Sequence, residues 1–319
     1  MSKPKVFVLN PYHPEAIALL QQSPEIDCVL PDDANISNWH DQAHGILIRS
    51  DTKITSSDIS HAPNLKVIVK QGVGVDNIDL SAAKEHGIIV CNTPAMNSET
   101  VAELTLTLAL CIARRIQEID RKLLRGKKLI RSNLLGQSLH GKTLGIIGMG
   151  NIGKQVARKW IGAMEGKILA YDPMLPNGAW GDIEHRRIVD LDELLKCADV
   201  VTLHVPLTDT TRGMIGKREF NLMRKNAIFL NCARGGLVDE EALLEALEED
   251  KIFGAALDAL EIEPPTLKAY NQLLACENFV LTPHVGATTD ENQRASGMVA
   301  VETLLAVLVN GEEVTNRLV

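Results

Sequence analysis

Short apolar runs, separated by polar stretches with helical composition, recur along the whole of this sequence. In the first hundred residues the runs fall at residues 5–9, 27–30, 45–48, 65–69 and 87–91. A helix is expected from Pro14 to Leu20, because proline is favoured at the first helical position. Strands that alternate with helices in this way predict a parallel sheet covered on both faces.

A second alternating series begins near Leu139. Its expected strands lie at residues 143–147, 167–171, 199–203, 227–231, 253–257 and 278–281, and a helix is expected at 239–249 with Asp239 as its N-cap. Residues 97–125 predict one long helix, and a last helix near 290–309 is apolar on one side and is expected to return to the first series. We therefore predict an α/β protein of two doubly wound parallel-sheet domains, 1–97 plus 287–319 and 98–286, with a cleft between them.

Composition narrows the class of protein. A hydrophobic content of 45%, a charged content of 23% and a net charge of −8 are typical of a soluble globular protein and argue against a nucleic-acid or membrane-surface partner. The sequence contains no long uncharged apolar run and no signal peptide, so no membrane span is expected. Six cysteines lie singly in apolar runs, which indicates free thiols, no metal or disulfide role and a reducing, cytoplasmic location.

A glycine-rich turn follows the apolar run at 143–147. Gly148, Gly150 and Gly153 have the G-x-G-x-x-G spacing at the start of an expected helix. This context predicts a Rossmann turn that holds a dinucleotide pyrophosphate at a helix N-terminus, whereas the spacing alone would fit any strand-to-helix turn. Asp172 ends the next apolar run and is placed to bind ribose hydroxyls. No Arg or Lys lies between Asp172 and Arg186, so NAD is expected as cofactor rather than NADP.

Three polar residues follow strands of the second series, namely Arg234, Glu263 and His284. The carboxyl ends of strands line the ligand crevice of a doubly wound sheet, so the three side chains can converge beside a nicotinamide. Each has a plainer alternative, as a bridging arginine, a loop acid or a packed histidine. Together they predict that Arg234 binds a carboxylate or carbonyl oxygen, that His284 is the acid/base, and that Glu263 orients the imidazole and favours its protonated form.

The first series offers groups for an acidic substrate. Residues 71–75 follow a strand, and the backbone N–H groups near Val73 and Gly74 can bind a carboxylate. Arg49 and Lys70 also follow strands and can bind a second acidic group, or can equally be solvated surface charges.

With these residues in view, the chain resembles the D-isomer-specific 2-hydroxyacid dehydrogenases, most closely their D-3-phosphoglycerate-dehydrogenase-like branch. The resemblance covers nearly the whole chain and rests on residues 71–79, 97–103, 141–153, 204–211, 231–236, 256–258, 263–265 and 283–289. It implies a flavodoxin-like substrate domain beside the Rossmann domain, and a homodimer formed through the nucleotide-binding domain. It also implies the roles given above to Arg234, Glu263 and His284. The NAD contacts that it implies are Gly148, Gly150, Asn151, Ile152, Gly153, Asp172, Val205, Pro206, Thr211, Cys232, Ala233, Asp258, Gly286 and Ala287.

The sequence departs from the family pattern in places. The family often has arginine where Asn151 stands, and the phosphoglycerate enzymes usually have arginine where Lys70 stands. Because the sequence ends at Val319, we expect no C-terminal regulatory domain and no serine feedback through one. The expected substrate is a small acidic 2-oxo or 2-hydroxy acid, with phosphoglycerate, hydroxypyruvate and glyoxylate among the candidates.

Two other functions stay open at this stage. A non-catalytic NAD-sensing scaffold, like the corepressors that resemble this family, would have similar motifs. Formate or phosphite dehydrogenases are a further alternative, although the formate enzymes have glutamine where Glu263 stands.

Overall fold

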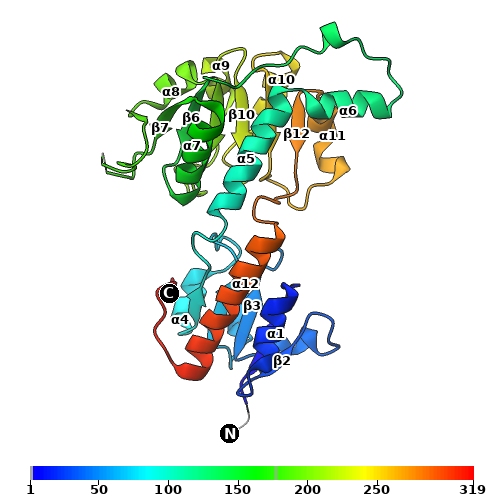
Figure 1. Cartoon of the computed structure of the whole chain (residues 1–319). Helices are drawn as coiled ribbons and strands as arrows, with labels where there is room; N and C mark the ends of the chain where they lie inside the picture. Colours follow the sequence, from blue (N-terminus) through cyan, green and yellow to red (C-terminus); the bar gives the residue numbers. More distant parts are fainter. Residues whose placement is uncertain (1–2, 177) are drawn as a thin grey trace. The chain divides into compact units, whose positions relative to one another are not determined.

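The computed structural model describes residues 3–176 and 178–319 of the 319-residue chain. The chain divides into two compact units, the first formed by Met1–Asn97 with Ala287–Val319 and the second by Ser98–Gly286. Each unit is built on one sheet, and both sheets are parallel throughout (Figure 1). This confirms the predicted fold class.

Unit 1 contains a five-stranded sheet in the order β2-β1-β3-β4-β5. This is the flavodoxin-like order, in which the chain winds from a central strand first to one side and then to the other. Its strands are β1 Lys5–Val8, β2 Asp27–Val29, β3 Gly45–Ile48, β4 Val67–Lys70 and β5 Ile89–Cys91. Its α-helices are α1 Pro14–Gln22, α2 Trp39–Gln42, α3 Ser56–Ser60, α4 Leu80–Glu85 and α12 Asp290–Leu305, with a 3₁₀ turn at Ile36–Asn38 and a π-helical turn at Ala306–Asn310.

Side chains of the unit 1 strands alternate between two cores. Val6 and Val8 pack with α1 and α12 on one face, and Phe7 packs with α3 and α4 on the other. Figure 1 shows α12, the last long helix, lying alongside α1. Helix α12 thus returns to the first sheet, where its apolar side is buried against α1 and the strands.

Unit 2 contains a seven-stranded sheet in the order β12-β11-β10-β9-β6-β7-β8. The direction of winding changes between β6 and β9, which is where a doubly wound sheet binds its ligand. The strands are β6 Thr143–Ile147, β7 Lys167–Tyr171, β8 Arg186–Ile188, β9 Val200–Leu203, β10 Ile228–Asn231, β11 Gly254–Leu257 and β12 Phe279–Leu281. Strand β8 was not predicted, because Arg186-Arg187-Ile188 at the sheet edge carries no apolar run.

The helices of unit 2 cover both faces of this sheet. Helices α5 and α7 pack with one core, and α8 to α11 pack with the other. Their bounds are α5 Ser98–Ala113, α6 Ile116–Leu124, α7 Asn151–Met164, α8 Leu191–Cys197, α9 Lys217–Leu222, α10 Glu240–Glu248 and α11 Leu267–Ala275, with a 3₁₀ turn at Arg131–Asn133. No helix in the described part of the chain is long and apolar enough to cross a membrane.

The prediction of one helix over residues 97–125 was wrong. Arg115 has φ +56, a left-handed conformation that ends α5 and lets α6 begin in a new direction. The break is fixed by tertiary contacts, since the backbone N–H of Gln137 donates to the carbonyl oxygen of Ala113 at 2.7 Å. The Arg115 side chain also donates to the carbonyl oxygen of Asn133 at 3.2 Å.

Candidate active site

The glycine-rich turn joins β6 to α7 at the centre of the unit 2 sheet. Gly148 has φ +103, and a Cβ added there would lie 2.4 Å from the carbonyl oxygen of His204. A Cβ on Gly153 would lie 2.2 Å from the carbonyl oxygen of Gly148. Neither position can carry a side chain, so the spacing of these two glycines is required by the packing of the turn.

Gly150 serves a different purpose. It is the N-cap of α7, makes no side-chain cap, and has open space where a Cβ would stand. The N–H groups of the first helical turn, which begins at Asn151 and Ile152, therefore face space that a side chain does not fill. An open, uncapped helix N-terminus suits a pyrophosphate group, so these residues fit the dinucleotide.

Asp172 lies beside this turn, directly after β7. Its Oδ2 accepts a hydrogen bond from the backbone N–H of Met149 at 2.9 Å, and its Oδ1 accepts one from that of Met174 at 2.9 Å. The carboxylate is thereby held next to the glycine-rich turn, where an adenosine ribose is expected.

Arg187 was missed in the sequence because fifteen residues separate it from Asp172. Pairing of β7 with β8 brings it close, and its Nη2 donates to the backbone carbonyl oxygens of Asp172 and Leu175, the latter at 2.9 Å. The guanidinium is thus bonded to the loop that follows β7, and it fixes the backbone on which Asp172 stands.

Other predicted cofactor contacts follow β9 and β10. Val205 follows β9 and lies beside the glycine-rich turn, since its Cγ1 would lie 2.9 Å from a Cβ on Gly148. The turn from Pro206 to Thr211 is closed by the Thr211 hydroxyl, which donates to the carbonyl oxygen of Pro206 at 2.7 Å. Cys232 is buried after β10, and burial raises the pKa of its thiol to about 12, so the thiol stays protonated and unreactive near neutral pH.

Arg234 is positioned by the buried Asn231 at the end of β10. The Asn231 Nδ2 donates to the carbonyl oxygen of Arg234 at 2.8 Å, and its Oδ1 accepts from the N–H of Ala233 at 3.0 Å. The Arg234 Nη1 donates to the carbonyl oxygen of Ala233 at 2.7 Å. One buried amide therefore fixes the backbone of the loop that carries this guanidinium.

His284 and Glu263 form a pair, from the loops after β12 and β11. The Nδ1 of His284 lies 3.0 Å from both carboxylate oxygens of Glu263, and each side chain is 34% exposed. A carboxylate only accepts, so Nδ1 carries the proton and Nε2 is left for exchange with a substrate. No residue in the described ranges hydrogen-bonds this Nε2.

The charge state of Glu263 follows from its neighbours. Burial disfavours the carboxylate, but the hydrogen bond and charge of His284, the N–H of Leu260 and the charge of Arg234 outweigh it. Together they lower the pKa of Glu263 below its ordinary value. Glu263 is therefore ionised near neutral pH and places a negative charge beside the imidazole of His284.

Asp258 holds the loop of His284 in place. It is 1% exposed at the end of β11, and its Oδ1 accepts from the Thr282 hydroxyl at 2.7 Å and the N–H of Val285 at 2.8 Å. Its Oδ2 accepts from the N–H of Gly286 at 2.9 Å. The resemblance implied that Asp258 contacts NAD, and its anchoring role was missed, although an acid directly after a buried strand is a usable signal.

Unit 1 places the predicted substrate groups at one edge of its own sheet. Ile48 pairs with Lys70, so Arg49 and Lys70 lie at adjacent strand ends. Lys70 is 5% exposed and its Nζ donates to the carbonyl oxygen of Gly74, whereas the Arg49 Nη1 donates to that of Pro11 at 3.2 Å.

The loop at residues 71–75 keeps two donors available. The N–H of Gly72 donates to the Thr93 hydroxyl at 2.8 Å. The N–H groups of Val73 and Gly74 have no acceptor among the described residues. These two donors suit a carboxylate.

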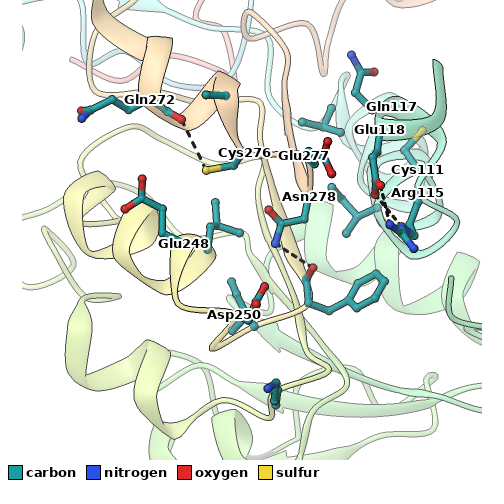
Figure 2. Close-up of a pocket in the computed structure, with 17 residues that line it drawn as sticks. Cys111, Arg115, Gln117, Glu118, Glu248, Asp250, Gln272, Cys276, Glu277 and Asn278 are labelled. Atoms are coloured by element: carbon teal, nitrogen blue, oxygen red, sulfur yellow. Dashed lines mark hydrogen bonds and ion pairs between the residues drawn. The ribbon is translucent and has the colours of Figure 1, made fainter. Parts of the chain in front are cut away.

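A separate pocket of about 580 Å³ lies at the amino ends of β10 to β12 (Figure 2). Asn278 stands in it just before β12, and its Nδ2 donates to the carbonyl oxygen of Phe253 at 3.2 Å. Arg234, Glu263 and His284 follow the carboxyl ends of the same strands. The pocket is therefore at the opposite edge of the sheet from the candidate active site.

The turn, Asp172 and the pair of His284 with Glu263 are the parts expected of a nicotinamide-dependent dehydrogenase. The model of the NAD-binding domain of D-isomer-specific 2-hydroxyacid dehydrogenases matches residues 106–286. The chain belongs to this family, and NAD is its cofactor.

Three similar proteins illustrate the relationship. The chain is 45% identical over 306 residues to a D-3-phosphoglycerate dehydrogenase of Methanocaldococcus jannaschii, covering 95% of this chain and 57% of that protein. It is 41% identical over 310 residues to a hydroxypyruvate reductase of Thermotoga maritima, covering 97% and 99%. Its structure resembles that of D-lactate dehydrogenase with NAD⁺ from Lactobacillus jensenii, with a TM-score of 0.79, 29% identity and 99% of each chain covered.

Proposed function

We propose that this chain is an NAD-dependent oxidoreductase that interconverts a 2-oxo acid and a D-2-hydroxy acid. The observation that carries the proposal is the pair formed by His284 and Glu263, whose Nδ1-to-carboxylate distances are both 3.0 Å. The two residues follow β11 and β12, which are neighbouring strands of the sheet that carries the glycine-rich turn.

Each residue has a defined task in this reaction. Arg234 binds the carboxylate or carbonyl oxygen of the substrate through its planar guanidinium. His284 donates the proton on Nε2 to the ketone oxygen during reduction, and accepts the hydroxyl proton in the reverse direction. Glu263 accepts the Nδ1–H hydrogen bond throughout and stabilises the imidazolium. NAD supplies the hydride chemistry when bound.

The proposed substrate is an acidic 2-oxo acid, in a phosphoglycerate-dehydrogenase-like reaction. The chain spans 57% of the M. jannaschii D-3-phosphoglycerate dehydrogenase, to which it is 45% identical. It spans 99% of the T. maritima hydroxypyruvate reductase, and this relative supports reduction of hydroxypyruvate or glyoxylate as the second candidate. Lys70 is 5% exposed whereas Arg49 is only half-buried, so Arg49 is the better placed cation for a terminal phosphate.

An NADH-oxidation screen tests both levels of the proposal. Hydroxypyruvate, its phosphorylated form, glyoxylate and pyruvate would be compared with wild type and Arg49→Gln. A preference for the phosphorylated acid that Arg49→Gln abolishes supports the phosphoglycerate-like reaction, and equal use of hydroxypyruvate and glyoxylate supports the second candidate. NADH binding without turnover of any acid would refute the enzyme and favour an NAD-sensing scaffold.

We also propose a homodimer formed through unit 2. Apolar side chains on α6 and the segment after it are exposed, namely Ile116, Leu123, Leu124, Ile130 and Leu135. A second copy of the chain would bury them. Light scattering after gel filtration should give twice the chain mass, and Leu124→Glu should lower it, whereas a monomeric wild type would refute the dimer.

A further inference from the structure

The loop that carries Glu263 is held by three consecutive backbone N–H groups. That of Leu260 donates to the Oε1 of Glu263 itself at 2.9 Å. That of Glu261 donates to the Oε1 of Glu240 at 2.9 Å, and that of Ile262 donates to the Tyr270 hydroxyl at 2.8 Å. Two of the three acceptors therefore belong to side chains outside the loop.

These two side chains come from the helices that flank the loop. Glu240 is the first residue of α10, and Tyr270 lies within α11 with 3% of its surface exposed. The Tyr270 hydroxyl and the Glu240 carboxylate also interact, and each contributes to the pKa of the other. Both side chains therefore accept from consecutive N–H groups of the same loop.

Burial sets the protonation of both groups. It raises the pKa of Tyr270 to about 12 and raises the pKa of Glu240, which also faces the charges of Glu261 and Glu263. Glu263 in turn faces His284 and Arg234. The tyrosine therefore stays a neutral donor over the working pH range.

The other side of the loop is closed by backbone. A Cβ added to Gly235 would lie 1.9 Å from the carbonyl oxygen of Leu260. The loop after Arg234 thus packs directly on the start of the Glu263 loop. The Glu263 loop is therefore held by the backbone at Gly235 and by side chains of the two helices.

We propose that Glu240 and Tyr270 are positioning residues that hold the Glu263 carboxylate against Nδ1 of His284. The inference rests on the proposed acid–base pair. Neither residue needs to meet the substrate, because both line a separate pocket of about 530 Å³ that His284, Glu263 and Arg234 do not line. Their effect passes through the 3.0 Å contacts of Glu263, and a displacement of about 1 Å in a catalytic group can cost about 100-fold in rate.

Four variants separate this role from general stability. Tyr270→Phe removes the acceptor for Ile262, and Glu240→Ala removes the acceptor for Glu261. Glu240→Gln keeps an acceptor oxygen at the same place, so it should preserve the hydrogen bond from Glu261 and the position of the loop. Glu241→Ala, the next residue of α10 and exposed, is the matched control.

The first readout is kcat/KM for reduction as a function of pH. We expect it to fall about tenfold in Tyr270→Phe and Glu240→Ala, with NADH affinity unchanged and the pH at half-maximal rate moved lower. Glu240→Gln and Glu241→Ala should match wild type. Lower melting temperatures with wild-type kcat/KM and pH dependence would overturn the proposal.

A second readout needs no substrate and survives failure of the proposed function. Nitrogen-15 NMR reports which ring nitrogen of neutral His284 carries the proton, and His284→Gln identifies its signals among the nine histidines. Glu263 holds the proton on Nδ1, so Tyr270→Phe and Glu240→Ala should shift it toward Nε2, and Glu240→Gln should not. An unchanged tautomer in Tyr270→Phe and Glu240→Ala would overturn the positioning role of Tyr270 and Glu240, whether or not any acid is turned over.

Discussion

Replacing Glu263 with glutamine tests the charge of the acid–base pair while preserving its shape. The amide oxygen can still accept from Leu260 and from Nδ1 of His284, so the loop need not move. Two unit charges about 4 Å apart attract by about 4 kcal/mol at an effective dielectric constant of 20. Both side chains are 34% exposed, so screening by water reduces the lost attraction to about 1–2 kcal/mol.

That loss has a measurable form. It corresponds to a factor of about 5 to 30 in kcat/KM for reduction, the direction in which the pair supplies the proton. The sign follows from charge, because a neutral amide stabilises the protonated state of the pair less than a carboxylate does. The half-maximal pH should therefore move down, and kcat/KM near neutral pH should fall about tenfold.

The assay is the absorbance of NADH during reduction of the preferred 2-oxo acid, measured across pH. Glu261→Gln removes the same charge from the same loop at an exposed position, and it serves as the matched control. If Glu263→Gln has the same half-maximal pH and the same kcat/KM as Glu261→Gln, the reasoning about this pair is refuted.

Three further predictions concern separate parts of unit 2. His284→Ala should lower turnover by about 10²- to 10⁴-fold and leave NADH binding, measured by fluorescence titration, unchanged; weakened binding would contradict its placement. Asp172→Ala should relax the preference for NAD over NADP in steady-state kinetics, and an unchanged ratio would remove the ribose assignment. Glu118→Gln should destabilise the fold by about 1–3 kcal/mol in urea unfolding, because the buried carboxylate bonds Arg115 and Lys122, both at 2.6 Å. Burial opposes ionisation of Glu118, but these partners lower its pKa in the folded protein. This stabilisation is therefore fully present when the pH is above the pKa of Glu118 in the unfolded chain, and it is lost as the pH falls through its pKa in the folded protein.

Most of the fold could be predicted because the buried strands are apolar runs bounded by polar residues. The five strands of unit 1 and six of the seven in unit 2 were expected close to where they lie. The exceptions have physical causes. Strand β8 is a polar edge strand, and the break at Arg115 depends on a segment twenty residues further along the chain. Neither leaves a mark in local hydrophobic periodicity.

The site residues divide in the same way. Asp172, Arg234, Glu263 and His284 could be nominated because each follows an apolar run that predicts a strand. Of the residues that hold them in place, Asp258 also follows an apolar run, but others could not be found from local sequence. Tyr270 lies on a helix after the Glu263 loop, and only the packing of that helix brings its hydroxyl to Ile262.

The strand order of unit 2 explains how one sheet can serve two chemical tasks. Asp172 follows β7 and the glycine-rich turn follows β6, whereas Arg234, Glu263 and His284 follow β10, β11 and β12, with β9 between the two groups. Neighbouring strands are about 4.8 Å apart, so β7 and β11 are separated by four spacings, or about 19 Å along the sheet edge. An extended dinucleotide laid along that edge would place its adenosine at β7 and its nicotinamide toward β10 to β12. In the proposed function, recognition of the cofactor and proton transfer are therefore built on different strands, so loops after β10 to β12 can change the acid that is reduced while β6 and β7 keep the same cofactor.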